Sequence, residues 1–281
     1  MNNTFDIIRF GKVLHNDGSI YLRNFGLTLA ILCGIPIVGW LVTLVFGFTM
    51  PTLIRWGAIY TTIFIGIILV PAKAFGYINL PREGVRFAML PASNLEKYLS
   101  YLLFCILTPV VIFLASWGID SILTLLPIGG FEHYIKSFSI QGMIQDFAVE
   151  IDAEMDSEDA FAINDFIKDI QPYYTFRLII GIIFNIGIFM FGNLLFKTHK
   201  TAKTLVIIIG ISYVATMIIQ AILAAKGIFP WQDGNSVGVS MDIDSIKDLN
   251  NTSMGISNIL YSLLTAGVYV GLFFKLKTQK Y

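Results

Sequence analysis

The sequence predicts an all-α, polytopic membrane protein with six transmembrane helices, an N-terminal amphipathic helix and a small helical outer insertion between helices three and four. Hydrophobic residues make up 56% of the 281 residues and charged residues only 14%, whereas roughly a quarter of the residues of a soluble domain are charged. The mean hydropathy is +0.73. Six apolar segments approach the ~20 residues that a helix needs to cross a ~30 Å hydrocarbon core.

These six segments carry almost no charge and lack the alternating pattern of a barrel strand. Each is expected to be a helix, because only a helix satisfies the backbone of a lone segment in lipid. The second is the shortest and reaches spanning length only if Trp56 and residues 72–74 form its ends. The segments run from about 26 to 47, 57 to 70, 98 to 126, 178 to 196, 205 to 225 and 256 to 274.

Residues 1–25 are predicted to be a cytoplasmic amphipathic segment that precedes the first span. Phe5 and Ile8 alternate with Asp6, Arg9 and Lys12, a pattern typical of a helix lying on the inner membrane surface. The polar run of residues 15–18 is expected to end this helix before the first span begins. Pro36, within the first span, removes one backbone donor and is expected to kink it.

The distribution of Lys and Arg predicts that both termini are cytoplasmic. Thirteen of the 19 basic residues, but only four of the 19 acidic ones, fall in the N-terminal segment, the second loop, the fourth loop and the C-terminal tail. The basic residues are Arg9, Lys12, Arg23, Lys73, Arg82, Arg86, Lys97, Lys197, Lys200, Lys203, Lys275, Lys277 and Lys280. Four independent segments therefore agree on one orientation. Residues 26–126 contain the first three predicted spans, and residues 175–281 contain the last three.

The two segments that remain on the outer side differ in kind. Residues 127–174 contain ten acidic residues against Lys136 and Lys168, and their apolar residues recur at spacings of three or four. One or two amphipathic helices are expected there, with Ser157 at the start of the second. Residues 226–255 are rich in Gly, Asp, Asn and Ser and are predicted to be an outer loop.

The cytoplasmic loop of residues 72–97 is the most informative segment for function. Ser93, followed three residues later by Glu96, is a capping box that can start a helix running directly into the third span. Before Pro91, residues 85–90 can form a short amphipathic helix with Val85, Met89 and Leu90 on one side. A short helix joined to a spanning helix forms a compact docking element, although an ordinary connector is equally compatible with the pattern.

Catalytic and cofactor-binding motifs are not found. The sequence lacks G-x-x-x-x-G-K-[ST] and H-E-x-x-H, so no nucleotide-binding P-loop, zinc protease, catalytic residue or cofactor is predicted. Cys33 and Cys105 lie in apolar runs and the three histidines lie far apart, so no metal site is expected. The net charge is zero, which gives no electrostatic support for binding nucleic acid.

Two patterns that could suggest ion binding are incomplete. No acidic residue lies in the middle of a predicted span, which argues against an ion-coupled carrier. The alternating acids of residues 152–158 lack the Gly and the final Glu of a calcium loop, since Ile163 stands where that Glu is required. Arg55, Asp120 and Arg177 lie near span ends, and whether they pair depends on the tertiary structure.

The loop and the six-span topology resemble the permease subunits of type-2 ABC exporters. In that family, the loop after helix two carries Glu and Arg, an apolar pair, Leu-Pro-x-Ser and then Glu. The matching residues are Glu83, Arg86, Leu90, Pro91, Ser93 and Glu96. Lys97 follows directly, where the family has a basic residue a few positions later, and the acidic outer segment is longer than in a minimal permease.

The resemblance implies that the loop is a coupling helix, in which these six residues and Lys97 contact a separate ATP-binding subunit. It also implies a homo- or heterodimer with a second permease and a multi-pass location in a bacterial inner (cytoplasmic) membrane. The alternative hypothesis is a membrane assembly or sensor protein that does not transport. Its acidic outer segment would bind a partner or a cation.

Overall fold

A computed structural model describes residues 5–80, 84, 85, 87, 89–126, 130, 131, 157–225 and 243–278 of the chain. Every regular element in this part of the chain is a helix, as the sequence predicts. The elements are α1 (Ile7–Cys33), α2 (Ile35–Phe46), α3 (Thr52–Lys73), the 3-10 helix η1 (Gly76–Asn79), α5 (Asn94–Thr124), α7 (Ser157–Leu195), α8 (Lys200–Ala225) and α9 (Ile243–Thr278).

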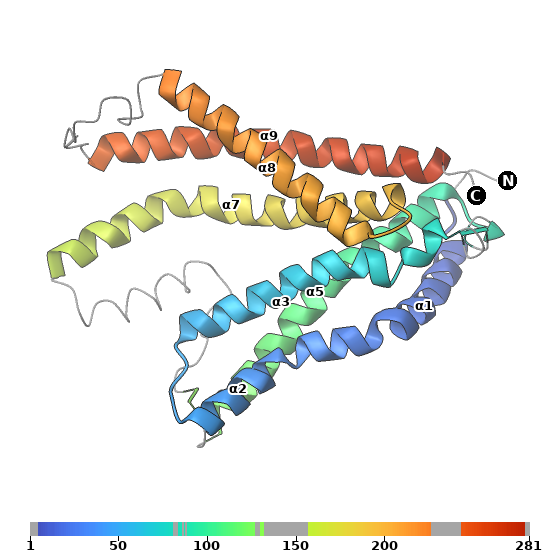
Figure 1. The fold of residues 1–281 in the computed structure, drawn as a ribbon, viewed down its shortest axis with the longest axis horizontal. Coiled ribbons are helices and arrows are strands. Elements are labelled where there is room, and N and C mark those ends of the chain that lie inside the picture. The colour runs from blue at the N-terminus through green and yellow to red at the C-terminus, as the bar shows by residue number, and fades with distance from the viewer. Residues whose placement is uncertain are drawn as a thin grey trace.

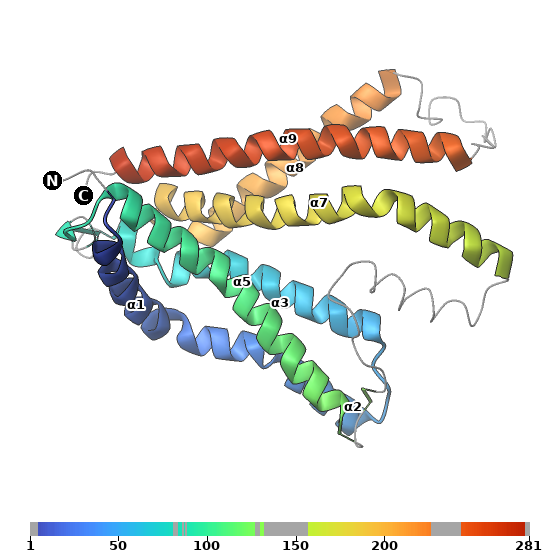
Figure 2. The ribbon, with the colours of Figure 1, turned by 180° about the vertical axis from the view of Figure 1, so that it is seen from behind.

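The helices form two arms that converge at one end of the molecule. The first arm contains α1, α2, α3 and α5, and the second contains α7, α8 and α9 (Figure 1). Both termini lie at the convergent end, together with the loop between α3 and α5, and the arms diverge away from it (Figure 2). Contacts of α3 with α7 and of α5 with α9 connect the arms.

The buried core runs along the bundle and includes residues of both arms. Its largest side chains include Phe25 of α1, Trp56 of α3, Tyr101 of α5 and Met190 of α7, together with Phe75, which follows α3. Large apolar residues are also widely exposed along the outer faces of the helices. An apolar outer surface is the arrangement expected of helices that face lipid.

Five helical segments of the described chain are long and apolar enough to cross a membrane. They are Ile7–Phe46, Ile54–Lys73, Asn94–Thr124, Thr175–Leu195 and Ser257–Thr278. The chain therefore has the build of a multi-pass membrane protein. The fifth predicted span, residues 205–225, is helical as part of α8 but is not among these five, so the total of six spans stays a prediction.

The N-terminal amphipathic segment is not a separate helix. The prediction that residues 15–18 end it is wrong, because α1 continues from Ile7 through this polar run to Cys33. The run is accommodated because the Asp17 carboxylate is buried and bonds to Ser100 of α5. The break comes later, at Gly34, and Pro36 lies in the first turn of α2, where its missing N–H breaks no hydrogen bond.

The outer segments contain more continuous helix than predicted. The described part of α7 starts at Ser157 and runs without interruption into the fourth span. α9 begins at Ile243, so the predicted loop of residues 226–255 is helical over its last part. Ile243, Ile246 and Leu249 recur at every third position, which is a weak helical periodicity. The polar composition of the segment nevertheless favoured a loop in the prediction from sequence. The first helix predicted in the acidic segment, before Ser157, lies outside the described residues.

Candidate functional site at the loop between α3 and α5

The start of α5 is fixed by the predicted capping box. The Ser93 Oγ accepts a hydrogen bond of 3.2 Å from the Glu96 N–H, and the Glu96 Oε2 accepts one of 2.8 Å from the Ser93 N–H. Two backbone donors that a helix start leaves without partners are satisfied in this way. The capping box therefore defines where the loop ends and the third span begins.

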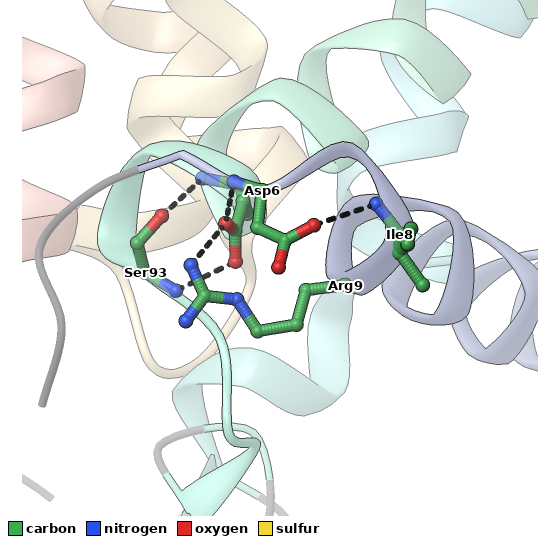
Figure 3. Close-up of polar contacts among 5 residues, drawn as sticks. Asp6, Ile8, Arg9 and Ser93 are labelled. Carbon is green, nitrogen blue, oxygen red and sulfur yellow. Dashed lines mark hydrogen bonds and ion pairs between the residues drawn. The ribbon is translucent and has the colours of Figure 1, made fainter.

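The same carboxylate joins α5 to the N-terminus of α1. Glu96 Oε1 accepts hydrogen bonds of 2.9 Å from the Asp6 N–H and of 2.9 Å from the Arg9 Nη2 (Figure 3). Asp6 itself caps α1, because its Oδ1 accepts a hydrogen bond from the Ile8 N–H. Glu96 is fully buried, and charge-assisted bonds of this kind are about twice as strong as neutral ones. The N-terminal segment is thus attached to the loop.

A second contact between α1 and α5 lies deeper in the bundle. The Ser100 hydroxyl donates a 2.6 Å hydrogen bond to Asp17 Oδ2, and Tyr77 of η1 donates a longer one of 3.5 Å to Asp17 Oδ1. Lys97, which is also buried, lies with its Nζ 5.4 Å from the centre of the Phe87 ring. The loop, α1 and α5 therefore share a buried polar cluster made of Asp17, Tyr77, Lys97 and Ser100.

The loop is also bonded to the second arm. The Asn79 side chain donates hydrogen bonds to the carbonyl oxygens of Asn193, Leu194 and Phe196, of which the shortest is 2.9 Å. These carbonyls end α7 and lack partners within the helix. Lys200 of α8 donates a 2.6 Å hydrogen bond to the Gly76 carbonyl, and burial lowers the pKa of its ammonium group.

A further bond to α7 lies at the end of α3. The Asn193 side-chain amide donates to the Phe75 carbonyl at 3.3 Å and to the Tyr101 hydroxyl at 3.0 Å. Phe75, Ile78 and Ala74 are fully buried, so the first half of the loop forms part of the core. The loop accordingly contacts helices of both arms at the point where the arms converge.

The short helix before Pro91 turns toward the core a residue outside its predicted apolar side. Gly84, Val85, Phe87 and Met89 are helical, but the residue that enters the core is Phe87, which is 3% exposed, while Met89 is 76% exposed. Phe87 packs edge-on against Tyr77 with ring centroids 6.2 Å apart. Of the three residues predicted to share one side, Val85 and Leu90 are half-buried and Met89 is exposed.

Four apolar side chains in the described part of the loop are exposed and are here called the loop surface. They are Leu80, Met89, Pro91 and Leu95. A cavity of about 110 Å³ lies between α1 and the loop and is lined by Asn16, Ile20, Arg23, Asn24, Tyr77, Phe87 and Leu90. A contiguous patch of exposed apolar residues with a polar rim marks a surface that binds a protein or a membrane.

The residues matched to the coupling helix occupy three different environments. Glu83 and Arg86 lie outside the described residues. Pro91 is exposed and Leu90 lines the cavity, whereas Ser93, Glu96 and Lys97 point into contacts within the chain. Sequence reasoning missed Asp6, Arg9 and Asp17 as members of this site. Their only signal was charge within an amphipathic segment, which equally fits a solvated face.

The described residues include no group of three His, Cys, Asp or Glu side chains that could hold a metal ion. Comparison of the chain with protein-family models, with curated proteins and with solved structures finds no match.

Proposed function

We propose that the chain is the membrane-spanning permease subunit of an ABC-type exporter, working with a separate ATP-binding subunit. The observation that carries this proposal is the position of the loop between α3 and α5. It bonds to α1, α5, α7 and α8 at the convergent end of the two arms. A force applied to the loop therefore acts on both arms at once.

The loop surface is the proposed contact with the ATP-binding subunit. Met89, Pro91 and Leu95 are exposed beyond the buried half of the loop, and exposed apolar residues of this kind supply the core of a protein interface. Glu96 and Lys97 are buried by the chain itself, so in this proposal they position the loop and do not touch the partner. Closure of the partner on ATP would move the loop and change the angle between the arms.

Charge distribution supports the orientation that this function needs. The start of α1, the loop, the end of α9 and the connection between α7 and α8 lie toward the same end of the bundle (Figure 1). These are the segments that hold most of the Lys and Arg residues. By the positive-inside rule this end faces the cytoplasm, where an ATP-binding subunit is found.

The proposal is tested by purifying the tagged protein from bacterial inner membranes in mild detergent and identifying co-purifying proteins by mass spectrometry. The wild type is expected to retain a P-loop ATPase at a stoichiometric level. Met89→Asp is expected to reduce this recovery by about tenfold or more, because a charge at the centre of an interface costs several kcal/mol. Met89 is 76% exposed, so the substitution leaves the fold intact.

Leu125→Asp is the matched control, because Leu125 is 73% exposed at the opposite end of α5. It is expected to retain the ATPase. Absence of any ATPase from a folded, abundant wild-type preparation would contradict the proposal. Equal recovery with Met89→Asp and Leu125→Asp would instead exclude the loop surface as the contact.

A further inference from the structure

The basic residues near the span ends differ in whether they have a partner within the bundle. Arg55 of α3 forms a buried ion pair with Asp120 of α5, with hydrogen bonds of 3.1 and 2.6 Å. Arg177 lies 3.2 Å from the centre of the Tyr261 ring. Arg23 of α1, by contrast, is exposed and forms no salt bridge with the described part of the chain. Its guanidinium group is therefore available to a ligand.

A second exposed cation, Lys73, lies on the neighbouring helix α3. The side chain of Asn24, next to Arg23, donates a 3.5 Å hydrogen bond to the Ala74 carbonyl, and Lys73 donates to Thr28 Oγ1. An ammonium group has three N–H donors, so this bond uses only one of them. Arg23 precedes the uncharged part of α1, and Lys73 ends a segment able to span a membrane. Both cations therefore lie at the depth of the lipid headgroups.

The cavity of about 110 Å³ between α1 and the loop is suited to an anionic group. Its polar lining residues are Asn16, Arg23, Asn24 and Tyr77, all of which carry hydrogen-bond donors. No acidic residue of the described chain lines it, because the neighbouring Asp17 carboxylate is fully buried and bonds to α5. A cavity of ~10–15 Å³ can hold one water molecule, so this one has room for a phosphate group.

The face of α1 that lines the cavity continues into the span as an exposed apolar strip. Asn16, Ile20 and Arg23 line the cavity. Leu27 and Ile31 follow Arg23 at intervals of four residues, and side chains at this spacing share one face of a helix. Leu27 is 78% exposed and Ile31 is 62% exposed. An anionic group at Arg23 therefore adjoins an apolar surface within the same leaflet, which is the arrangement that a lipid headgroup and its acyl chain require.

We infer that this site binds one anionic phospholipid of the leaflet at the convergent end. The phosphate lies at the mouth of the cavity, with Arg23 and Lys73 as cations and Asn24 as a further donor. An acyl chain lies along Leu27 and Ile31. Basic pockets between spanning helices bind anionic headgroups in this way. A zwitterionic lipid carries an ammonium group that would meet the same two cations, so the anionic lipid is preferred.

The inference does not depend on the proposed ATP-binding subunit and is tested on the purified, delipidated chain in detergent. Phosphatidylglycerol and phosphatidylcholine with identical acyl chains are titrated separately, and bound lipid is counted by native mass spectrometry. The first phosphatidylglycerol molecule is expected to bind about tenfold more tightly than the first phosphatidylcholine molecule, a factor of the size expected from contacts with basic residues at the membrane surface. Equal affinity for the two lipids would overturn the inference.

The two cations are tested by Arg23→Gln combined with Lys73→Gln, both at exposed positions. This variant is expected to bind phosphatidylglycerol about tenfold more weakly than the wild type and to lose the preference over phosphatidylcholine. Lys203→Gln combined with Lys277→Gln is the matched control, because it removes two exposed cations from the start of α8 and the end of α9. The control is expected to keep the preference. An equal loss in both variants would show that net charge alone sets the affinity and would overturn the inference.

Two further measurements distinguish the lipid from other anionic occupants. Inorganic phosphate is expected not to displace bound phosphatidylglycerol, because it lacks the acyl chain that contacts Leu27 and Ile31. Displacement by phosphate would identify a site for a soluble anion instead. The Arg23→Gln, Lys73→Gln variant is also expected to retain the proteins that co-purify with the wild type. Loss of such a protein, with phosphatidylglycerol bound as in the wild type, would assign the cavity to an acidic segment of a protein partner and overturn the inference.

Discussion

At the scale of single residues, Glu96 has the largest structural role in the loop. Its carboxylate is the acceptor for Asp6, Arg9 and Ser93, so one side chain fixes both the start of α5 and the position of α1. Three donors would lose their partner if it were removed. A hydrogen bond to a charged group contributes about 1.5–3 kcal/mol to stability, and water can replace part of this contribution because the three donors lie on residues that are not buried.

Glu96→Ala is therefore expected to lower the free energy of unfolding by about 3 kcal/mol and to release the N-terminus of α1. The measurements are thermal unfolding in detergent and the rate of tryptic cleavage after Arg9 and Lys12. Asn94→Ala, at an exposed position in the same turn of α5, is the control. Cleavage at the wild-type rate in Glu96→Ala would show that Glu96 does not hold the N-terminal segment.

At the scale of the helices, the approach of α8 to α7 depends on a glycine. A Cβ at Gly192 would overlap Thr204 Oγ1 and would lie 2.9 Å from Thr204 Cβ. The Cβ of Thr204 cannot move without its backbone, so an added methyl group would push the helices apart. Small residues that allow close backbone contact are a common feature of helix packing in membranes.

Gly192→Ala is expected to destabilise the protein by about 1–3 kcal/mol, the usual effect of overpacking. Gly181→Ala is the control on the same helix, because nothing lies within 4 Å of its Cβ position. This control is expected to be neutral or to stabilise α7 by up to ~1 kcal/mol through helix propensity. The measurement is thermal unfolding of both variants in the same detergent. Equal melting temperatures would contradict the close contact between Gly192 and Thr204.

At the scale of the whole molecule, the arrangement of the arms predicts which segments lie on the same side of the membrane. The first part of α1, which contains His15, and the end of α9, which is Thr278, lie at the convergent end, whereas the connection between α2 and α3, which contains Phe48, lies at the other end (Figure 1). All three are exposed. If the convergent end faces the cytoplasm, His15 and Thr278 are separated from Phe48 by the membrane.

Single cysteines at these three positions, with Cys33 and Cys105 replaced by Ala, test the orientation. A membrane-impermeant maleimide applied to intact cells is expected to label Phe48→Cys and to spare His15→Cys and Thr278→Cys until the membrane is opened. The charge bias that sets this orientation comes from four separate segments. Labelling of Thr278→Cys in intact cells would reverse the predicted location of the C-terminus.

The helical class, five apolar helices long enough to cross a membrane and the capping box at Ser93 could be predicted from the sequence alone. These features depend on composition, on periodicity and on residues three positions apart, and such local signals are complete within the sequence. The continuity of α1 through residues 15–18 was not predictable, since it depends on the burial of Asp17 against Ser100.

Only the tertiary structure decided which charged residues pair. Glu96 and Arg9 are 87 positions apart, and Arg55 and Asp120 are 65 apart. Pairing over such distances along the chain depends on how the helices pack. The sequence pattern around a charged residue of an amphipathic helix does not show whether its side chain faces water or a buried partner. The sequence therefore marked the loop as a candidate site, and packing determined which of its side chains bond inward and which remain exposed.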